Sequence, residues 1–105
     1  MRWRDSRRVY FVPPRVLLGD LERAFAKLGL ECSISEAEGG WELTGSRASD
    51  RVRVTLSYTL EDVFRESRAI GEIPVSTIVC EVEGDREFVE TFKRALEVSL
   101  LRCLG

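Results

Sequence analysis

TIVCEVEGDREFVETFKRAL, residues 77–96, combines a strand pattern and a helix pattern in one continuous segment. Ile78, Cys80 and Val82 occupy alternate positions, which is the period of a half-buried β-strand. Asp85 is a preferred N-cap residue, and the apolar residues after it recur at helical spacing. The segment therefore predicts a strand followed by a helix that runs to Cys103 and packs its apolar side against a sheet.

The N-terminal part of the chain predicts a second pair of a strand and a helix. The run Arg8–Val12 is β-branched and aromatic, as is typical of strands, and Pro13 and Pro14 suit the start of a helix. The apolar positions of this helix recur at steps of three and four residues; they are Leu18, Leu21, Phe25 and Leu28. Gly29 follows at the position of a left-handed C-terminal cap.

Three alternating runs between these two pairs predict an antiparallel meander. Their apolar members are Leu30, Cys32 and Ile34 in the first run, Trp41 and Leu43 in the second, and Val52, Val54, Leu56 and Tyr58 in the third. The connections at 38–40 and 45–50 contain residues typical of hairpin turns. Residues 59–74 fit two conformations, a short capped helix or a prolongation of the preceding strand.

Together these elements predict an α+β fold in the order β-α-β-β-β-β-α. An antiparallel sheet of about five strands carries both helices on one face, which makes two layers. The length of 105 residues fits a single domain over residues 1–105. Within this domain residues 1–7 form a basic arm, which can be either flexible or ordered.

The composition favours a binding protein over an enzyme. The chain has no histidine, which excludes Ser-His-Asp and Cys-His catalysis as well as His-bearing zinc sites. It also lacks a glycine-rich phosphate loop before a helix, and we predict no catalytic residue, no cofactor and no metal. Five acidic residues lie close together where the last predicted strand meets the last helix; they are Glu81, Glu83, Asp85, Glu87 and Glu90. We expect them to form a solvated edge of the sheet and to cap the helix. The alternative is that they bind a cation.

The three cysteines and the amide content bear on redox state and source. Cys32, Cys80 and Cys103 fall on apolar positions, so we expect them in the core, an internal disulfide being the alternative. Asn and Gln are absent and 14 of the 16 basic residues are arginine, a pattern that indicates a thermophile. No run approaches the roughly 20 apolar residues of a membrane span and no export signal is evident, so we expect a cytoplasmic protein.

Arginine is concentrated near the N-terminus, although the net charge of the chain is only −2. Residues 1–15 contain five arginines and one aspartate, and the other residues carry a charge of −6, from 11 basic and 17 acidic side chains. Arginine beside aromatic residues is typical of surfaces that hold single-stranded nucleic acid, whereas Trp3 can equally dock on the domain. The polar face of the sheet is the other candidate surface. The predicted binding residues are Arg2, Arg4, Arg7, Arg8, Arg51 and Arg53.

The order of elements is similar to one half of the TATA-box-binding protein. The segment Cys80–Phe88 also resembles the strand, Gly-Asp turn and Phe-bearing helix of kinase-associated C-terminal domains, although the residues before the turn are acidic here and basic there. Both resemblances imply a non-catalytic module for acidic lipid, nucleic acid or protein. We expect a small interaction module that forms a homodimer or another homo-oligomer, or serves as an accessory subunit. The alternative is a nucleic-acid-binding protein that uses the N-terminal arginines and the polar sheet face.

Overall fold

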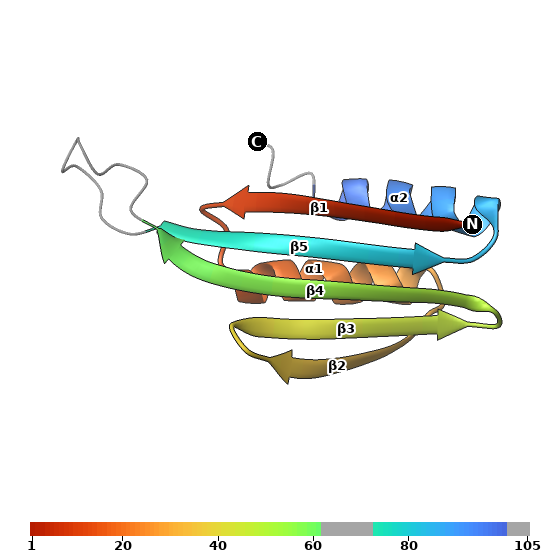
Figure 1. Ribbon diagram of the computed structural model, residues 1–105, viewed down its shortest axis with the longest axis horizontal. Helices are drawn as coiled ribbons and strands as arrows, with labels where there is room; N and C mark the ends of the chain where they lie inside the picture. The colour runs from red at the N-terminus through yellow and green to blue at the C-terminus, as the bar shows by residue number, and fades with distance from the viewer. Residues whose placement is uncertain (62–72, 101–105) are drawn as a thin grey trace.

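The computed structural model describes residues 1–61 and 73–100, and its elements follow one another in the predicted order (Figure 1). The strands are β1 (Arg2–Tyr10), β2 (Glu31–Ala37), β3 (Gly40–Arg47), β4 (Asp50–Glu61) and β5 (Ile73–Glu83), and the helices are α1 (Pro14–Lys27) and α2 (Arg86–Ser99). The predicted α+β class is confirmed.

The strands form one antiparallel sheet in the order β1-β5-β4-β3-β2. Short hairpins join β2 to β3 and β3 to β4, whereas β1 lies at one edge and pairs with β5 from the other end of the chain. Both helices lie on the same side of this sheet, which gives the two predicted layers (Figure 1). We call the side of the sheet opposite α1 and α2 the open face.

The core fills the space between the helices and the sheet. Most of the predicted inward positions of β3, β4 and β5 are buried; they are Leu43, Val52, Val54, Leu56, Ile78, Cys80 and Val82. The prediction is wrong for Tyr58, which is 41 % exposed, and Trp41 is only half-buried. Phe25 of α1 and Phe92 of α2 meet edge to face above them, with ring centroids 6.1 Å apart. Trp3 of β1 packs edge to face on Phe92 at 6.5 Å, and each such aromatic pair contributes about 0.5–1.5 kcal/mol beyond the buried area.

Both predicted helix caps are confirmed. The carboxylate of Asp85 accepts a hydrogen bond of 2.7 Å from the backbone N–H of Phe88, which satisfies one of the free donors at the start of α2. Gly29 has a φ of +70° at the end of α1, in the left-handed region where glycine carries no steric cost.

Strand β1 begins at Arg2 and not at Arg8, so residues 2–7 are part of the sheet and not a flexible arm. Trp3 pairs with Val82 and Asp5 with Cys80, which places Trp3 and Asp5 on the side of the helices. The charged side chain of Asp5 on the inward face hides the period of two that would have predicted this part of the strand.

Helix α1 turns toward the sheet a face slightly different from the predicted one. Its buried residues are Leu17, Asp20, Leu21, Ala24 and Phe25, whereas Leu18 and Leu28 are only half-buried and pack at the margin of the core. Leu17 and Leu18 are adjacent, so the sequence alone does not show which of them faces the sheet. In the structure Leu17 is the one that is buried.

Strand β2 forms the second edge of the sheet and is exposed along its whole length. The alternation predicts Cys32 and Ile34 in the core, and this prediction is wrong because β2 extends beyond the area that α1 covers (Figure 1). Residues 59–61 prolong β4, as one of the two alternatives predicts. Residues 62–72 and Cys103 lie outside the described residues.

Candidate functional site

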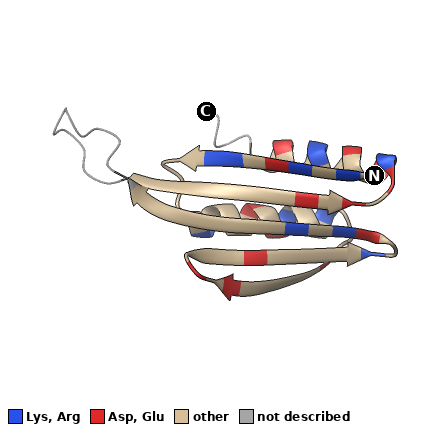
Figure 2. Ribbon diagram, viewed as in Figure 1, with Lys and Arg blue, Asp and Glu red and all other residues tan. Residues whose placement is uncertain are grey.

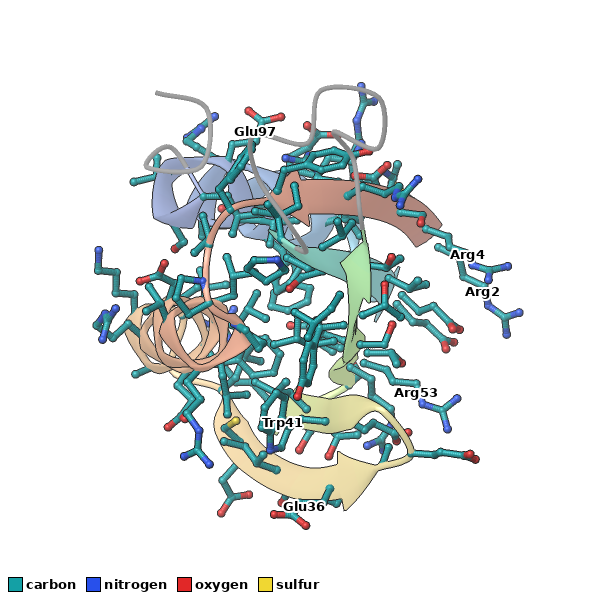
Figure 3. All side chains as sticks on the ribbon, turned by 90° about the vertical axis from the view of Figure 1, so that its left-hand side faces the viewer. Arg2, Arg4, Glu36, Trp41, Arg53 and Glu97 are labelled. Atoms are coloured by element: carbon teal, nitrogen blue, oxygen red, sulfur yellow. The ribbon has the colours of Figure 1, made fainter. Side chains whose placement is uncertain are left out.

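The open face collects most of the predicted binding residues. In an antiparallel sheet, side chains of paired residues lie side by side on the same face. Arg4 of β1 pairs with Glu81 of β5, which in turn pairs with Arg53 of β4. Figure 3 shows Arg2, Arg4 and Arg53 extending from the sheet on the side away from the helices.

Charges of alternating sign follow one another across three strands of this face. The two charged rows are Arg2–Glu83–Arg51 and Arg4–Glu81–Arg53. All six side chains are exposed, and Figure 2 shows the basic, acidic and basic positions succeeding one another from β1 over β5 to β4. Cross-strand neighbours of opposite charge stabilise a sheet by about 0.2–1 kcal/mol each.

A hollow of about 1010 Å³ lies over the charged rows. All six charged residues line it, together with Ser33, Thr44 and Ser46 of β2 and β3. Most of the lining residues belong to the two charged rows and to the residues that continue these rows across β3 and β2, Ser46 and Glu31 in one row and Thr44 and Ser33 in the other. The hollow therefore opens on the open face. It offers guanidinium, carboxylate and hydroxyl groups to any molecule that covers this face.

The charged rows contain one long ion pair, and Arg53 is hydrogen-bonded to a carboxylate outside them. The guanidinium of Arg2 lies 3.8 Å from the carboxylate of Glu83, and that of Arg53 bonds to Glu42 on β3 at 3.2 Å. For Arg4, Arg51 and Glu81 no ion pair occurs within residues 1–61 and 73–100. Exposed pairs of this kind contribute at most about 1 kcal/mol, so these groups can change partners at little cost.

Two of the predicted arginines stand apart from the hollow. Arg7 lies on the helix side of β1, where its guanidinium contacts Asp5 at 2.7 Å and Glu97 of α2 at 3.7 Å. Arg8 shares the open face but lies farther along β1, 5.5 Å from the ring of Tyr10. The structure therefore brings Arg2, Arg4, Arg51 and Arg53 together with Glu81 and Glu83, and places Arg7 on the other side of the sheet.

Trp3 is half-buried on the helix side of β1. Its ring packs against the core and Phe92, and the ammonium of Lys93 lies 5.2 Å from the ring centroid. Trp3 therefore docks on the domain, which is one of the two roles predicted for it. Tyr10, which is 41 % exposed, is the aromatic residue of β1 that lies on the open face.

The acidic group divides between two roles. Asp85 caps α2 and Glu90 lies 3.5 Å from Lys93, whereas Glu81 and Glu83 belong to the charged rows. Nowhere in residues 1–61 and 73–100 do three or more potential metal ligands converge.

Neither of the helices described is long and apolar enough to cross a membrane.

Cys80 carries a strongly perturbed thiol. Burial, helped by the negative charge of Asp5, raises the pKa of this thiol from 9.0 to about 12, although the positive charge of Arg7 acts in the opposite direction. The unfolded chain therefore releases the thiol proton first, and the stability contributed by the buried thiol is complete below pH 9 and is lost toward pH 12. We expect the free energy of unfolding to fall by up to about 1.4 kcal/mol per pH unit in this range.

Denaturant unfolding of wild type and Cys80→Ala at increasing pH measures this effect. The variant is less stable overall, because it leaves a small cavity, but it should lose less stability per pH unit above pH 9. Parallel curves for the two proteins would show that Cys80 does not contribute. In the folded protein iodoacetamide should modify the exposed Cys32 and spare Cys80.

No protein-family model matches this sequence, and no curated protein matches it. The function is therefore inferred from the open face itself.

Proposed function

We propose that this protein is a small non-enzymatic interaction module that binds another polypeptide, a second copy or a larger subunit, on the open face of its sheet. A cytoplasmic location and a thermophilic source belong to the same proposal and rest on the composition. The observation that carries the proposal is the alternation of arginine and glutamate in the charged rows that line the hollow.

Alternating charge favours a polypeptide over a polyanion. A protein surface can present carboxylates to Arg4 and Arg53 and a basic group to Glu81 between them. A phosphate backbone carries one sign of charge and would lie against both glutamates of the charged rows. Complementary charges across an interface determine the register and exclude wrong partners more than they add affinity. The exposed charged rows, with few ion pairs of their own, are suited to this role.

A peptide screen tests the proposal. Immobilised protein should select, from a random phage-displayed library, peptides that contain both acidic and basic residues. Glu81→Arg should weaken binding of a selected peptide at least about tenfold, or 1.4 kcal/mol, because it removes the carboxylate and places a third cation between Arg4 and Arg53. Fluorescence anisotropy with the labelled peptide measures the affinity.

Arg94→Glu is the matched control, because Arg94 is exposed on α2 in the opposite layer. It changes the net charge by the same amount in the other direction and should leave peptide affinity unchanged. If no peptide binds wild type more tightly than it binds Glu81→Arg, the open face is not a polypeptide site.

The second candidate function is nucleic-acid binding, favoured by the four arginines that line one hollow. A single-stranded oligonucleotide should then bind Glu81→Arg more tightly than wild type, opposite to the peptide. Replacing Arg4 and Arg51 together with alanine should reduce the dependence of log affinity on log salt by about 1.4, or roughly 0.7 for each phosphate contact. An unchanged slope would exclude these arginines as phosphate ligands.

A further inference from the structure

The two edges of the sheet differ in how they are protected. Natural edge strands resist pairing with other chains when they carry charged side chains, proline or a bulge. β1 carries four arginines (Arg2, Arg4, Arg7 and Arg8). β2 has the sequence ECSISEA, and all seven of its residues are exposed. It has no proline, and its two charged residues, Glu31 and Glu36, lie toward its ends and leave the central segment 32–35 uncharged. The edge formed by β2 is therefore the one open to another strand.

The hairpin geometry determines which backbone groups β2 presents outward. Ala37 and Gly40 close a two-residue loop, and the residues that flank such a loop form a hydrogen-bonded pair. Because hydrogen-bonded and non-hydrogen-bonded pairs alternate, the N–H and C=O groups of Cys32, Ile34 and Glu36 point away from β3. Ile34, at the centre of the strand, is also 40 % exposed.

We propose that two copies of this chain associate through antiparallel pairing of their β2 strands about a twofold axis at Ile34. This inference rests on the proposed interaction function but names a different surface and a definite partner. Ile34 lies opposite its own copy, Cys32 opposite Glu36, and Ser33 opposite Ser35. Because Cys32, Ile34 and Glu36 are the outward-facing residues, all three can exchange backbone hydrogen bonds with the second copy.

The sequence of β2 is compatible with itself in this register, and that of β1 is not. Around Ile34 no like charges face each other and the two isoleucines bury apolar surface together, which stabilises a cross-strand pair. The equivalent pairing of β1 about Ser6 would set Arg4 opposite Arg8 of the copy, and like charges directly opposite are destabilising.

Pairing at β2 joins two five-stranded sheets into one continuous sheet. The axis is perpendicular to the sheet, so the helices of both copies stay on one side and both open faces lie on the other. The dimer would present two hollows on one extended surface and leave the Arg-rich β1 strands as its outer edges.

Light scattering and sedimentation equilibrium over a range of concentrations test the dimer. Wild type should convert from monomer to dimer as concentration rises. Ile34→Lys should raise the dissociation constant at least about tenfold, because it opposes two cations at the axis. Val16→Lys on α1 is the matched control, since Val16 is also β-branched and 37 % exposed, and it should leave the constant unchanged.

Two further variants separate this contact from the open face. Ile34→Pro removes an outward N–H while leaving the bonds to β3 in place, and it should abolish the dimer without loss of far-UV circular dichroism. Glu81→Arg should dimerise as wild type does while losing peptide binding. A failure of Glu81→Arg to affect peptide binding would thus count against the proposed function alone.

A wild type that remains monomeric at all concentrations overturns the inference, as does an unchanged dissociation constant in folded Ile34→Lys or Ile34→Pro. Should both variants fail to fold, hydrogen exchange of wild type decides. The amides of Cys32, Ile34 and Glu36 should become more protected as concentration rises, and protection that is independent of concentration would contradict the pairing.

Discussion

Replacing Phe92 with alanine is expected to lower the free energy of unfolding by about 3–5 kcal/mol. The side chain is 1 % exposed and touches the rings of Phe25 on α1 and Trp3 on β1. Its removal takes away buried apolar area and leaves a cavity at the point where both helices meet the sheet. A small domain has a total stability of only about 5–15 kcal/mol, so the variant should be close to unfolding at ordinary temperature.

Urea unfolding followed by circular dichroism measures this loss. Val98→Ala is the control on the same helix, because Val98 is 55 % exposed and a surface substitution of this kind changes stability by at most about 0.5 kcal/mol. A loss below about 1.5 kcal/mol for Phe92→Ala would mean that the core collapses into the space and that Phe92 does not hold the layers together.

Gly40→Ala should be comparably damaging for a different reason. A Cβ at Gly40, the first residue of β3, would overlap the main-chain oxygen of Leu56 on β4. The backbone cannot rotate out of the way as a side chain can, so β3 and β4 must separate at this end. We expect a loss of about 3 kcal/mol or more, at the upper end of overpacking costs, with weakened binding of the β2–β3 hairpin to the sheet.

Gly19→Ala makes the comparison informative because the same change should have the opposite sign there. Gly19 lies within α1, and a Cβ would be 3.4 Å from the guanidinium of Arg23, which is ordinary van der Waals contact with a long side chain. Alanine is favoured over glycine inside a helix by about 0.5–1 kcal/mol, so this variant should be slightly more stable than wild type. If both substitutions proved neutral in denaturant unfolding, the close approach of Gly40 to β4 would be refuted.

The sequence was sufficient to predict the elements whose burial is one-sided. Strand β5 and helix α2 have a clean period because one face is fully covered, and the Asp85 cap is a local signal that needs no tertiary information. The same patterns could not show how far the helices extend over the sheet. Alternation assigns Ile34 to the helix side of β2 correctly, but only the width of the helical layer shows that this side is open to solvent.

Much of the candidate site was also within reach of the sequence. The polar face with Arg51 and Arg53 follows from the period of two in β4. The counter-charges were missed as part of the site, because the position of Glu81 beside Arg53 depends on strand order, which hairpin patterns do not reveal for β1 and β5. A signal was nevertheless present, since Glu81 and Glu83 repeat the two-residue spacing of the arginines.

The position of Arg7 could not be predicted from the sequence. A cluster of arginines in sequence suggests one basic surface, but neighbouring positions of a strand point to opposite faces. Once residues 2–7 belong to β1, Arg7 must lie with Trp3 and Asp5 on the helix side, where it contacts Glu97. Predicting this outcome required the start of the strand, which the charged inward side chains conceal.

The pairing of β1 with β5 also constrains the order of events during synthesis. The paired residues lie between 65 (Tyr10 and Val75) and 81 (Arg2 and Glu83) positions apart. At about 5–20 residues per second, β1 is synthesised several seconds before β5, the strand with which it pairs. Contacts between residues so far apart in sequence slow folding, so we expect β1 to join the sheet after the other strands have paired. Until then its charged side chains keep the unpaired strand hydrated.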